Sequence, residues 1–343
     1  MENDLVLVTG GSGFIAQYCI LALLREGYAV RTTLRSAARQ AEVLEYLQRG
    51  GMAPDARLSF ALADLESDVG WDAAVAGCRF VMHGASPTPS GRQETEEDWI
   101  RPAVDGNLRV LRSAHAAGVK RVVLTSAFGA IGVGHPKDYR RPFDETDWSD
   151  LTGDVAPYQK SKTLSERAAW AFASNEGQGM ELSTVNPVAV VGPALGADIS
   201  HSIRLIKNLL EGTSKCPDIT SCYVDVRDVA DLHLLAMTHP AAAGQRFLAT
   251  SGHSLKLIEV AHVLRMRMGS AAKKAPRTEL PDFLFRLAAL KNDALKHIAP
   301  LLGVDMTASG EKARRLLGWT PRPPEDAIAA TGESLVQLGL VPA

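Results

Sequence analysis

The 343-residue chain is poor in the features that mark disulfide-rich, nucleic-acid-binding and metal-binding proteins. Its four cysteines are too few and too widely spaced for a disulfide framework or a zinc site, so we expect reduced thiols in a cytoplasmic protein. The 37 basic residues are balanced by 39 acidic ones, and no basic run is long enough to follow a phosphate backbone. No cluster of acidic residues and histidines has metal-ligand spacing. We therefore expect no nucleic-acid partner and no metal.

Long hydrophobic runs are absent as well. No segment reaches the roughly 18 uninterrupted apolar residues that a membrane-spanning helix needs. The start, Met1 to Asp4, lacks the basic residues and the long apolar core of a signal peptide. Apolar residues nevertheless make up 46% of the chain, enough to bury a substantial core. The composition predicts a globular protein with no membrane partner, and it leaves open whether the protein is a monomer or a homodimer.

Short apolar runs alternate with helical patterns through the first half of the chain. The runs predict strands at residues 5–9, 28–35, 57–62, 79–83, 120–126 and 182–186. The periodic segments between them predict helices at residues 14–25, 37–48, 99–117 and 156–173. This alternation is typical of an α/β fold, and we predict a Rossmann-type, doubly wound parallel sheet.

The pattern loosens after Pro187, where proline and glycine recur. A predicted strand at 223–225, a helix at 226–237 and a strand at 247–250 have the character of the first half. We therefore predict a nucleotide-binding domain over residues 1–186, rejoined by about 223–250. Residues 187–222 and 251–343 are predicted to form a smaller, mostly helical substrate-binding lobe.

A glycine-rich loop joins the first predicted strand to the first predicted helix. Gly10 permits a tight turn, Gly13 lets the backbone approach a pyrophosphate, and Ala16 lets the helix pack close to the strand. A pyrophosphate in such a loop sits on the helix N-terminus. The motif predicts a dinucleotide cofactor, and its predicted contacts are Gly10, Ser12, Gly13, Phe14 and Ile15.

The end of the second predicted strand indicates which dinucleotide binds. NAD sites usually have an acidic residue there, whereas this strand ends at Arg35 and no carboxylate follows until Glu42. A guanidinium suits a phosphate dianion, so we predict NADP(H), with Arg35 at the 2′-phosphate and Arg39 as its helper. Asp64, after the third strand, is predicted either to bind the adenine amine or to cap a helix.

Tyr158 and Lys162 form the predicted catalytic pair. They lie four residues apart in a helix that opens after Pro157, so their side chains share one helix face. A phenol with a free pKa of about 10 exchanges protons poorly at neutral pH, and a nearby ammonium favours the phenolate. We predict that Tyr158 donates a proton to the substrate oxygen as hydride reaches carbon, with Lys162 activating it and contacting the cofactor ribose.

The combined pattern resembles the extended short-chain dehydrogenases, in particular the group with dihydroflavonol 4-reductase, cinnamoyl-CoA reductase and microbial aldehyde or ketone reductases. The resemblance rests on residues 9–16, 35, 64–65, 83–87, 125–126, 158–162 and 186–193, and it continues more weakly through 223–230. It implies that Leu65, Ala85 and Ser86 line the cofactor, and that residues Pro187 to Val190 hold its carboxamide end.

Two positions depart from the pattern of that family. The family's catalytic serine usually falls second in a Thr-Ser-Ser run, whereas this chain has Thr125, Ser126 and Ala127. We predict that Ser126 donates to the substrate carbonyl instead, with Thr125 ranked second because successive strand residues point to opposite faces. The other departure is Gly132, where plant flavonoid reductases carry a polar residue that grips the flavonoid ring.

The region around Gly132 predicts an apolar substrate pocket. Phe128 and Ile131 lie nearby in the sequence, and together with Ser86 they are the predicted substrate contacts. Such a pocket favours a simple aryl or alkyl aldehyde or ketone over a flavonoid.

The sequence thus predicts an NADPH-dependent carbonyl reductase. The alternatives of the same fold are a sugar-nucleotide epimerase or dehydratase, which the arginine-ended second strand opposes, and a hydroxysteroid dehydrogenase. The non-enzymatic alternative is an NADP-sensing regulatory protein, which Tyr158 and Lys162 oppose and Ala127 slightly favours. The natural substrate and the stereochemical preference stay open.

Overall fold

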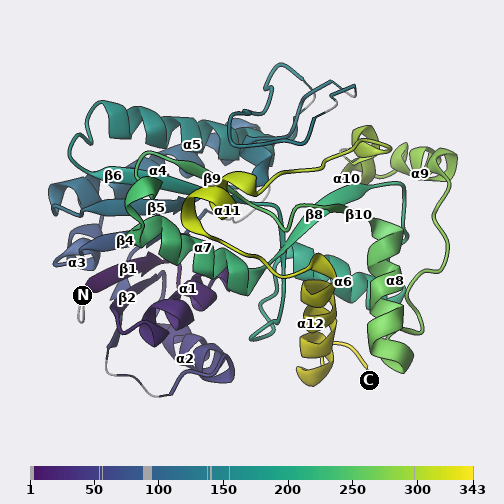
Figure 1. Ribbon diagram of the computed structural model, residues 1–343, viewed down its shortest axis with the longest axis horizontal. Coiled ribbons are helices and arrows are strands. Elements are labelled where there is room, and N and C mark those ends of the chain that lie inside the picture. Colours follow the sequence, from purple (N-terminus) through teal and green to yellow (C-terminus); the bar gives the residue numbers. More distant parts are fainter. Residues whose placement is uncertain are drawn as a thin grey trace.

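The computed structural model describes residues 4–53, 55, 57–87, 95–136, 138–139, 141–153, 155–296 and 298–342. Residues 1–3, on which the signal-peptide argument partly rests, lie outside this set. A large sheet with helices on both faces forms the main body, and a smaller lobe carrying α6, α8 and α12 extends from one side of it (Figure 1). The C-terminus lies in this lobe.

The large sheet has seven strands in the order β3-β2-β1-β4-β5-β6-β9, and every neighbouring pair is parallel. Because strand order reverses between β1 and β4, a crevice opens at the carboxyl ends of these strands. The predicted doubly wound α/β sheet is confirmed. The strand bounds are β1 Leu5–Thr9, β2 Ala29–Leu34, β3 Leu58–Leu62, β4 Phe80–His83, β5 Arg121–Thr125, β6 Glu181–Pro187 and β9 Arg246–Ala249.

Alternating side chains of the central strands feed two separate cores. Val6 and Val8 of β1 belong to one buried cluster and Leu7 to another, as the two-residue strand period requires. The first cluster lies under α1 and α7, and the second lies under α3, α4 and α5. The helices on the large sheet are α1 Phe14–Arg25, α2 Gln40–Arg49, α3 Trp71–Val75, α4 Glu97–Ala116, α5 Pro157–Ser174, α7 Val226–Thr238 and α11 Glu311–Leu317.

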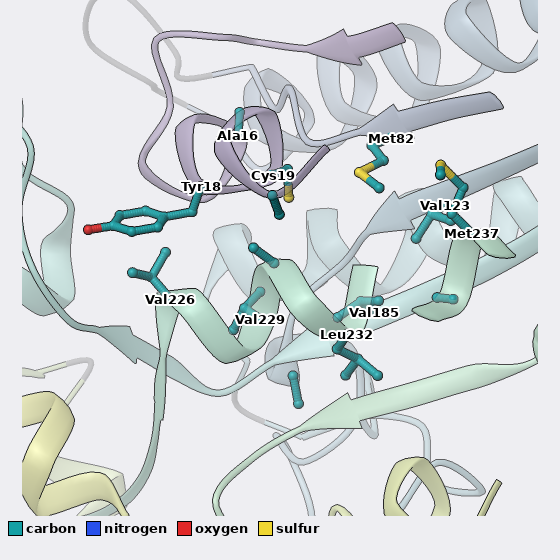
Figure 2. Packing of buried hydrophobic residues seen from close by; sticks show 14 of the residues in the cluster. Ala16, Tyr18, Cys19, Met82, Val123, Val185, Val226, Val229, Leu232 and Met237 are labelled. Carbon is teal, nitrogen blue, oxygen red and sulfur yellow. The ribbon is translucent and has the colours of Figure 1, made fainter. Parts of the chain in front are cut away.

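Helices α1 and α7 pack side by side on one face of the sheet. Figure 2 shows Cys19 of α1 and Val229 of α7 in one buried cluster with sheet residues such as Val123 and Val185. Cys19 and Val229 are fully or almost fully buried, and apolar burial of this kind is the dominant stabilising term in folding. Packing against α7 therefore holds α1 in place, and the N-terminus of α1 directly follows the glycine loop.

The lobe has its own sheet and its own core. Strands β7 Ala189–Val191, β8 Thr220–Asp225 and β10 Ser254–Lys256 form a three-stranded sheet in the order β10-β8-β7. Its core includes Ile203 of α6 and Leu264 of α8. The remaining elements are α6 His201–Glu211, α8 Leu257–Met268, α9 Asp282–Ala289, α10 Asp293–Lys296 and α12 Pro324–Gln337, with 3₁₀ turns Ala37–Arg39, Phe128–Ala130, Pro240–Ala242, Gly269–Ala272 and Ala299–Leu301.

The return to the large sheet starts three residues later than predicted. Residues 223–225 belong to β8 of the small sheet, whereas α7 and β9 rejoin the main body. The sequence pattern identifies a buried strand but not its partner, because pairing depends on where distant strands lie.

Candidate functional site

A cleft of about 490 Å³ runs along the carboxyl ends of the central strands. The glycine loop and the end of β2 form one part of its wall, and the segment after β4 forms another. It brings together ten of the predicted cofactor contacts: Gly10, Ser12, Gly13, Phe14, Arg35, Arg39, Asp64, Leu65, Ala85 and Ser86. Residues 198–200, which sequence analysis did not single out, also line it.

The glycine loop makes a tight turn beside the cleft and leads directly into the N-terminus of α1. Gly10 has φ +72°, a region that residues with a Cβ rarely adopt, and its N–H donates to Thr33 Oγ1 at 2.9 Å. Gly13 is the N-cap of α1 and no side chain caps the helix there. The first N–H groups of a helix lack intrahelical partners, and the helix dipole favours negative charge at that end. The loop therefore suits a pyrophosphate.

The three basic residues near the end of β2 have different surroundings. Arg31 donates through Nη1 to the carbonyls of Ala73, Ala74 and Ala76 at 3.2, 3.0 and 2.8 Å, so it holds the C-terminal end of α3. Arg35 is exposed and lines the cleft, and no ion pair to it is present within the described ranges. Arg39 also lines the cleft but is paired with acidic residues.

Asp64 does not cap a helix. Its Oδ1 accepts from the backbone N–H of Glu66 at 3.1 Å, whereas α3 begins only at Trp71, after Gly70. The Asp64 carbonyl accepts from Trp71 Nε1 at 2.9 Å, which fixes the turn against the cleft wall. The second predicted role, a contact to adenine, stays a prediction.

Helix α5 brings Lys162 to the wall of the cleft. Its Nζ donates to Ser86 Oγ at 3.0 Å and lies 5.7 Å from the ring centroid of Tyr158. The Tyr158 side chain is open to solvent, with 46% of the residue exposed, and its ring packs edge-on against Trp99 at 6.3 Å. The predicted pair therefore shares a helix face, next to the segment after β4 that lines the cleft.

The Ser126 hydroxyl has a different partner from the predicted one. It donates to Glu166 Oε2 at 2.5 Å in a buried position. A hydroxyl has one proton to give, and a carboxylate is a stronger acceptor than a neutral carbonyl. In the structure the Ser126 hydroxyl therefore points its proton at Glu166, and Ser126 must break that bond before it can donate to a substrate.

Thr125, the second choice, is engaged in the same way. Nδ1 of His233 lies 2.7 Å from the Val229 carbonyl, which can only accept, so Nδ1 carries the ring proton. Burial lowers the pKa of His233 to about 4, so the ring is neutral and its Nε2 accepts from Thr125 Oγ1 at 2.7 Å. The threonine hydroxyl therefore already donates its proton in a hydrogen bond to His233.

Glu166 is the centre of a buried polar network that sequence analysis missed. Besides the bond from Ser126, it accepts from Arg246 Nε at 2.7 Å and from Asn186 Nδ2 at 2.6 Å. Arg246 in turn lies with its guanidinium carbon 3.8 Å from the ring centroid of Trp148. Glu166 lies four residues after Lys162 in α5, so the helical period could have placed it on the same helix face. No sequence pattern could have identified its partners Asn186 on β6 and Arg246 on β9.

The prediction that Ile131 contacts substrate is wrong. Its side chain is fully buried in the main core, because the loop after β5 turns inward there. Phe128 is half-buried and packs edge-on against Phe143 at 5.7 Å. The space of a Cβ at Gly132 is filled by the Phe128 ring, 2.2 Å away, so glycine has a packing reason at this position.

A second cavity of about 150 Å³ lies beside this loop. Its lining includes His135, whose ring stands 4.9 Å from Tyr139, and Tyr139 stacks on Phe143 at 4.5 Å. The chain segment 300–306 closes the other side, with Leu301 and Met306 among its residues. The wall is mainly aromatic and aliphatic.

Three predicted cofactor contacts pack against other parts of the protein. Ile15 and Val190 pack against the main core, and Pro187 ends β6 opposite Ala249 of β9. Their contacts to a cofactor stay predictions. In the part of the chain that the structure describes, no three metal-ligating side chains form a group, and no helix is both long and apolar enough to cross a membrane.

Comparisons with known proteins agree with this geometry. The family model described as "NAD dependent epimerase/dehydratase family" matches residues 6–249. Cinnamoyl-CoA reductase 1 of Arabidopsis thaliana is 36% identical over 262 residues, covering 74% of this chain and 73% of the relative. Cinnamoyl-CoA reductase CAD2 of Medicago truncatula is 33% identical over 339 residues, 97% of this chain and 96% of the relative. The crystal structure of yeast methylglyoxal/isovaleraldehyde reductase Gre2 complexed with NADPH has a TM-score of 0.81 and 26% identity, covering 98% of this chain and 99% of that one.

Proposed function

Because the chain belongs to the NAD dependent epimerase/dehydratase family and is similar to its reductases, we propose that it reduces an aldehyde or ketone to an alcohol with NADPH. The observation that carries the proposal is the 3.0 Å bond from Lys162 to Ser86. It joins the helix with the tyrosine–lysine pair to the wall of a cleft that suits a dinucleotide.

The residues of the cleft fit NADP(H). The glycine loop and the N-terminus of α1 suit the pyrophosphate, and the volume of about 490 Å³ is within the usual range for ligand pockets. Arg35 has no acidic partner in the described part of the chain and lies in the cleft wall, which supports a 2′-phosphate at this end. The bound cofactor supplies the hydride for the carbonyl carbon.

The chain's own contribution is to hold the substrate and to donate a proton. Tyr158 is exposed at the start of α5, so its hydroxyl is free to reach a carbonyl oxygen and give it a proton. Lys162 stands on the same face and offers positive charge where negative charge develops. The Ser126 and Thr125 hydroxyls are bonded elsewhere, so the proposal assigns the proton to Tyr158.

The lining of the second cavity supports the proposed substrate class. Its aromatic and aliphatic wall suits an aryl or alkyl group better than a sugar nucleotide, whose hydroxyls and phosphates need many polar partners. The relatives named for cinnamoyl-CoA, methylglyoxal and isovaleraldehyde support an aryl or alkyl carbonyl compound as substrate.

The test is consumption of NADPH with a panel of aryl and alkyl aldehydes and ketones, followed by absorbance. We expect turnover with part of the panel and at least about tenfold tighter binding of NADPH than of NADH. Arg35→Ala should remove most of that preference, while Arg112→Ala, at an exposed site on α4, should keep it. Tight NADPH binding without turnover of any carbonyl would contradict the reductase and favour an NADP-sensing protein.

A further inference from the structure

Arg39 is the more strongly neutralised of the two arginines in the cleft wall. Its Nε donates to Glu42 at 2.9 Å, its Nη2 to Asp198 at 2.8 Å, and its Nη1 to Ser12 Oγ at 3.2 Å. Each of the three guanidinium nitrogens therefore already donates to an oxygen. A guanidinium has five N–H groups, so two remain, and a phosphate that binds the Nη2 side of Arg39 competes with Asp198 for that side.

The lining of the cleft is also unfavourable to a dianion as it stands. Its charged residues are Arg35 and Arg39 against Asp64, Glu66 and Asp198. A 2′-phosphate brings about two further negative charges to this end of the cleft. Moving one carboxylate away from an arginine reduces this excess of negative charge around the phosphate.

The two acidic partners of Arg39 differ in how firmly they are held. Glu42 is three residues away on α2, and it also accepts from the Tyr46 hydroxyl at 2.8 Å. Asp198 comes from 159 residues along the chain, and its side chain is 56% exposed. Asp198 is therefore the partner that a phosphate can exchange.

The loop that carries Asp198 has other anchors. Arg49 of α2 donates to the Leu195 carbonyl at 2.6 Å, and the Tyr46 ring fills the space beside Gly196 so closely that a Cβ there would lie 2.0 Å away. These contacts keep the loop packed on α2 when the ion pair between Asp198 and Arg39 breaks. This makes the Arg39–Asp198 pair a contact that can open and close without moving the loop.

We propose that Asp198 is a cofactor-specificity residue, which competes with the 2′-phosphate of NADP(H) for the Arg39 guanidinium. The proposal rests on the proposed NADPH-dependent function. With the cleft empty, Asp198 pairs with Arg39 across its mouth; with NADP(H) bound, the phosphate takes the Nη2 side and Asp198 turns to solvent. Asp198 lowers the affinity for NADP(H) selectively, because NAD(H) has no phosphate at this position.

The experiment measures dissociation constants of NADPH and NADH for the full chain by fluorescence titration. Asp198→Asn keeps the shape but removes the charge, and we expect NADPH to bind about fivefold more tightly, the scale of an exposed ion pair, while NADH changes by less than about twofold. In an Arg39→Ala background, Asp198→Asn should change NADPH affinity by less than about twofold, because the competition is gone. Asp326→Asn is the matched control, since Asp326 forms an exposed ion pair with Arg267 in the lobe.

Three outcomes would overturn the proposal. Equal changes for NADPH and NADH would mean that the pair only supports the loop. If Asp198→Asn also tightens NADPH binding in the Arg39→Ala background, Asp198 acts through its charge on the whole cleft and not through Arg39. A weaker binding of NADPH in Asp198→Asn would mean that the pair has to stay closed on the cofactor. If the unaltered protein does not bind NADPH, the proposed function fails; if it does and Asp198→Asn shows no selective gain, only this proposal fails.

Discussion

Tyr158 differs from most tyrosines of the chain in having its side chain nearly half exposed, beside a lysine and an indole ring. If its hydroxyl is the proton donor, Tyr158→Phe should lower turnover of a carbonyl substrate about a hundredfold or more, the usual scale for a lost general acid. The NADPH dissociation constant should stay within about twofold, because the ring and its packing on Trp99 remain. Steady-state kinetics and a binding titration measure the two effects separately.

The matched control is Tyr28→Phe, which removes the hydroxyl of a tyrosine that packs in the core away from the cleft. This variant should keep normal turnover. Near-normal turnover of Tyr158→Phe would refute the assignment of the proton donor.

Ser126 gives the second test at this scale. Its hydroxyl is bonded to a buried carboxylate, so Ser126→Ala should cost about 1–3 kcal/mol of unfolding free energy, the penalty of an unsatisfied buried group. Turnover should fall by less than about tenfold, since Tyr158 supplies the proton. Denaturant unfolding and kinetics on one preparation measure both quantities. A fall near a hundredfold with unchanged stability would restore Ser126 as a donor to the substrate.

Helix α5 combines two tasks along one stripe. Tyr158, Lys162 and Glu166 follow each other at four-residue spacing, so the helix presents an exposed hydroxyl, a cationic side chain and a buried carboxylate in succession. The buried end fixes the exposed end, because Glu166 is bonded to residues of β6 and β9 in the large sheet. The position of the proposed proton donor therefore depends on a polar network in the core.

Removing the carboxylate at position 166 should expose this dependence. Glu166→Ala leaves the guanidinium of Arg246 buried without its charged partner, and its Nη2 already has no hydrogen-bond partner among the described residues. Breaking a buried pair from one side costs about 3–5 kcal/mol, which we expect as the loss in unfolding free energy. The exposed Glu176→Ala should cost less than about 1 kcal/mol. Equal losses in the two variants would contradict the structural role of Glu166.

Over the whole molecule, two buried histidines make stability depend on pH. Desolvation lowers the pKa of His83 to about 3 and that of His233 to about 4. The unfolded chain binds a proton on each histidine as pH falls below about 6.5, whereas the folded protein does not. Their contribution to stability is therefore complete above pH 6.5 and is lost as pH falls below it. Asp228 acts in the opposite direction, since burial raises its pKa to about 6, and burial also raises the pKa of Asp231 and of Glu145.

His233→Gln isolates one of these contributions. The unfolding free energy of the unaltered protein should fall more steeply between about pH 6.5 and 5 than that of the variant, by about 1.4 kcal/mol per pH unit. Denaturant titrations at several pH values provide both slopes. Parallel slopes would mean that His233 takes up a proton in the folded state at ordinary pH.

Local pattern accounts for the elements that sequence analysis predicted. The predicted strand at 5–9 and helix at 14–25 have the bounds of β1 and α1, because apolar periodicity and glycine punctuation act within a few residues. The cleft residues Gly10, Ser12, Gly13 and Arg35 followed from the same local motifs, because a phosphate loop is built from consecutive residues. Ile131 failed as a substrate contact because the direction of a loop side chain depends on the core beneath it.

The sequence by itself determined the alternating α/β order, the phosphate loop and the spacing of Tyr158 and Lys162, since these depend on residues near each other in the chain. Only the tertiary structure decided that the Ser126 hydroxyl donates to Glu166, and that Asp198 pairs with Arg39 in the cleft wall. These contacts join residues 40 and 159 positions apart. Sequence periodicity cannot predict such pairs. The partner of a side chain depends on which distant elements pack together in the folded core.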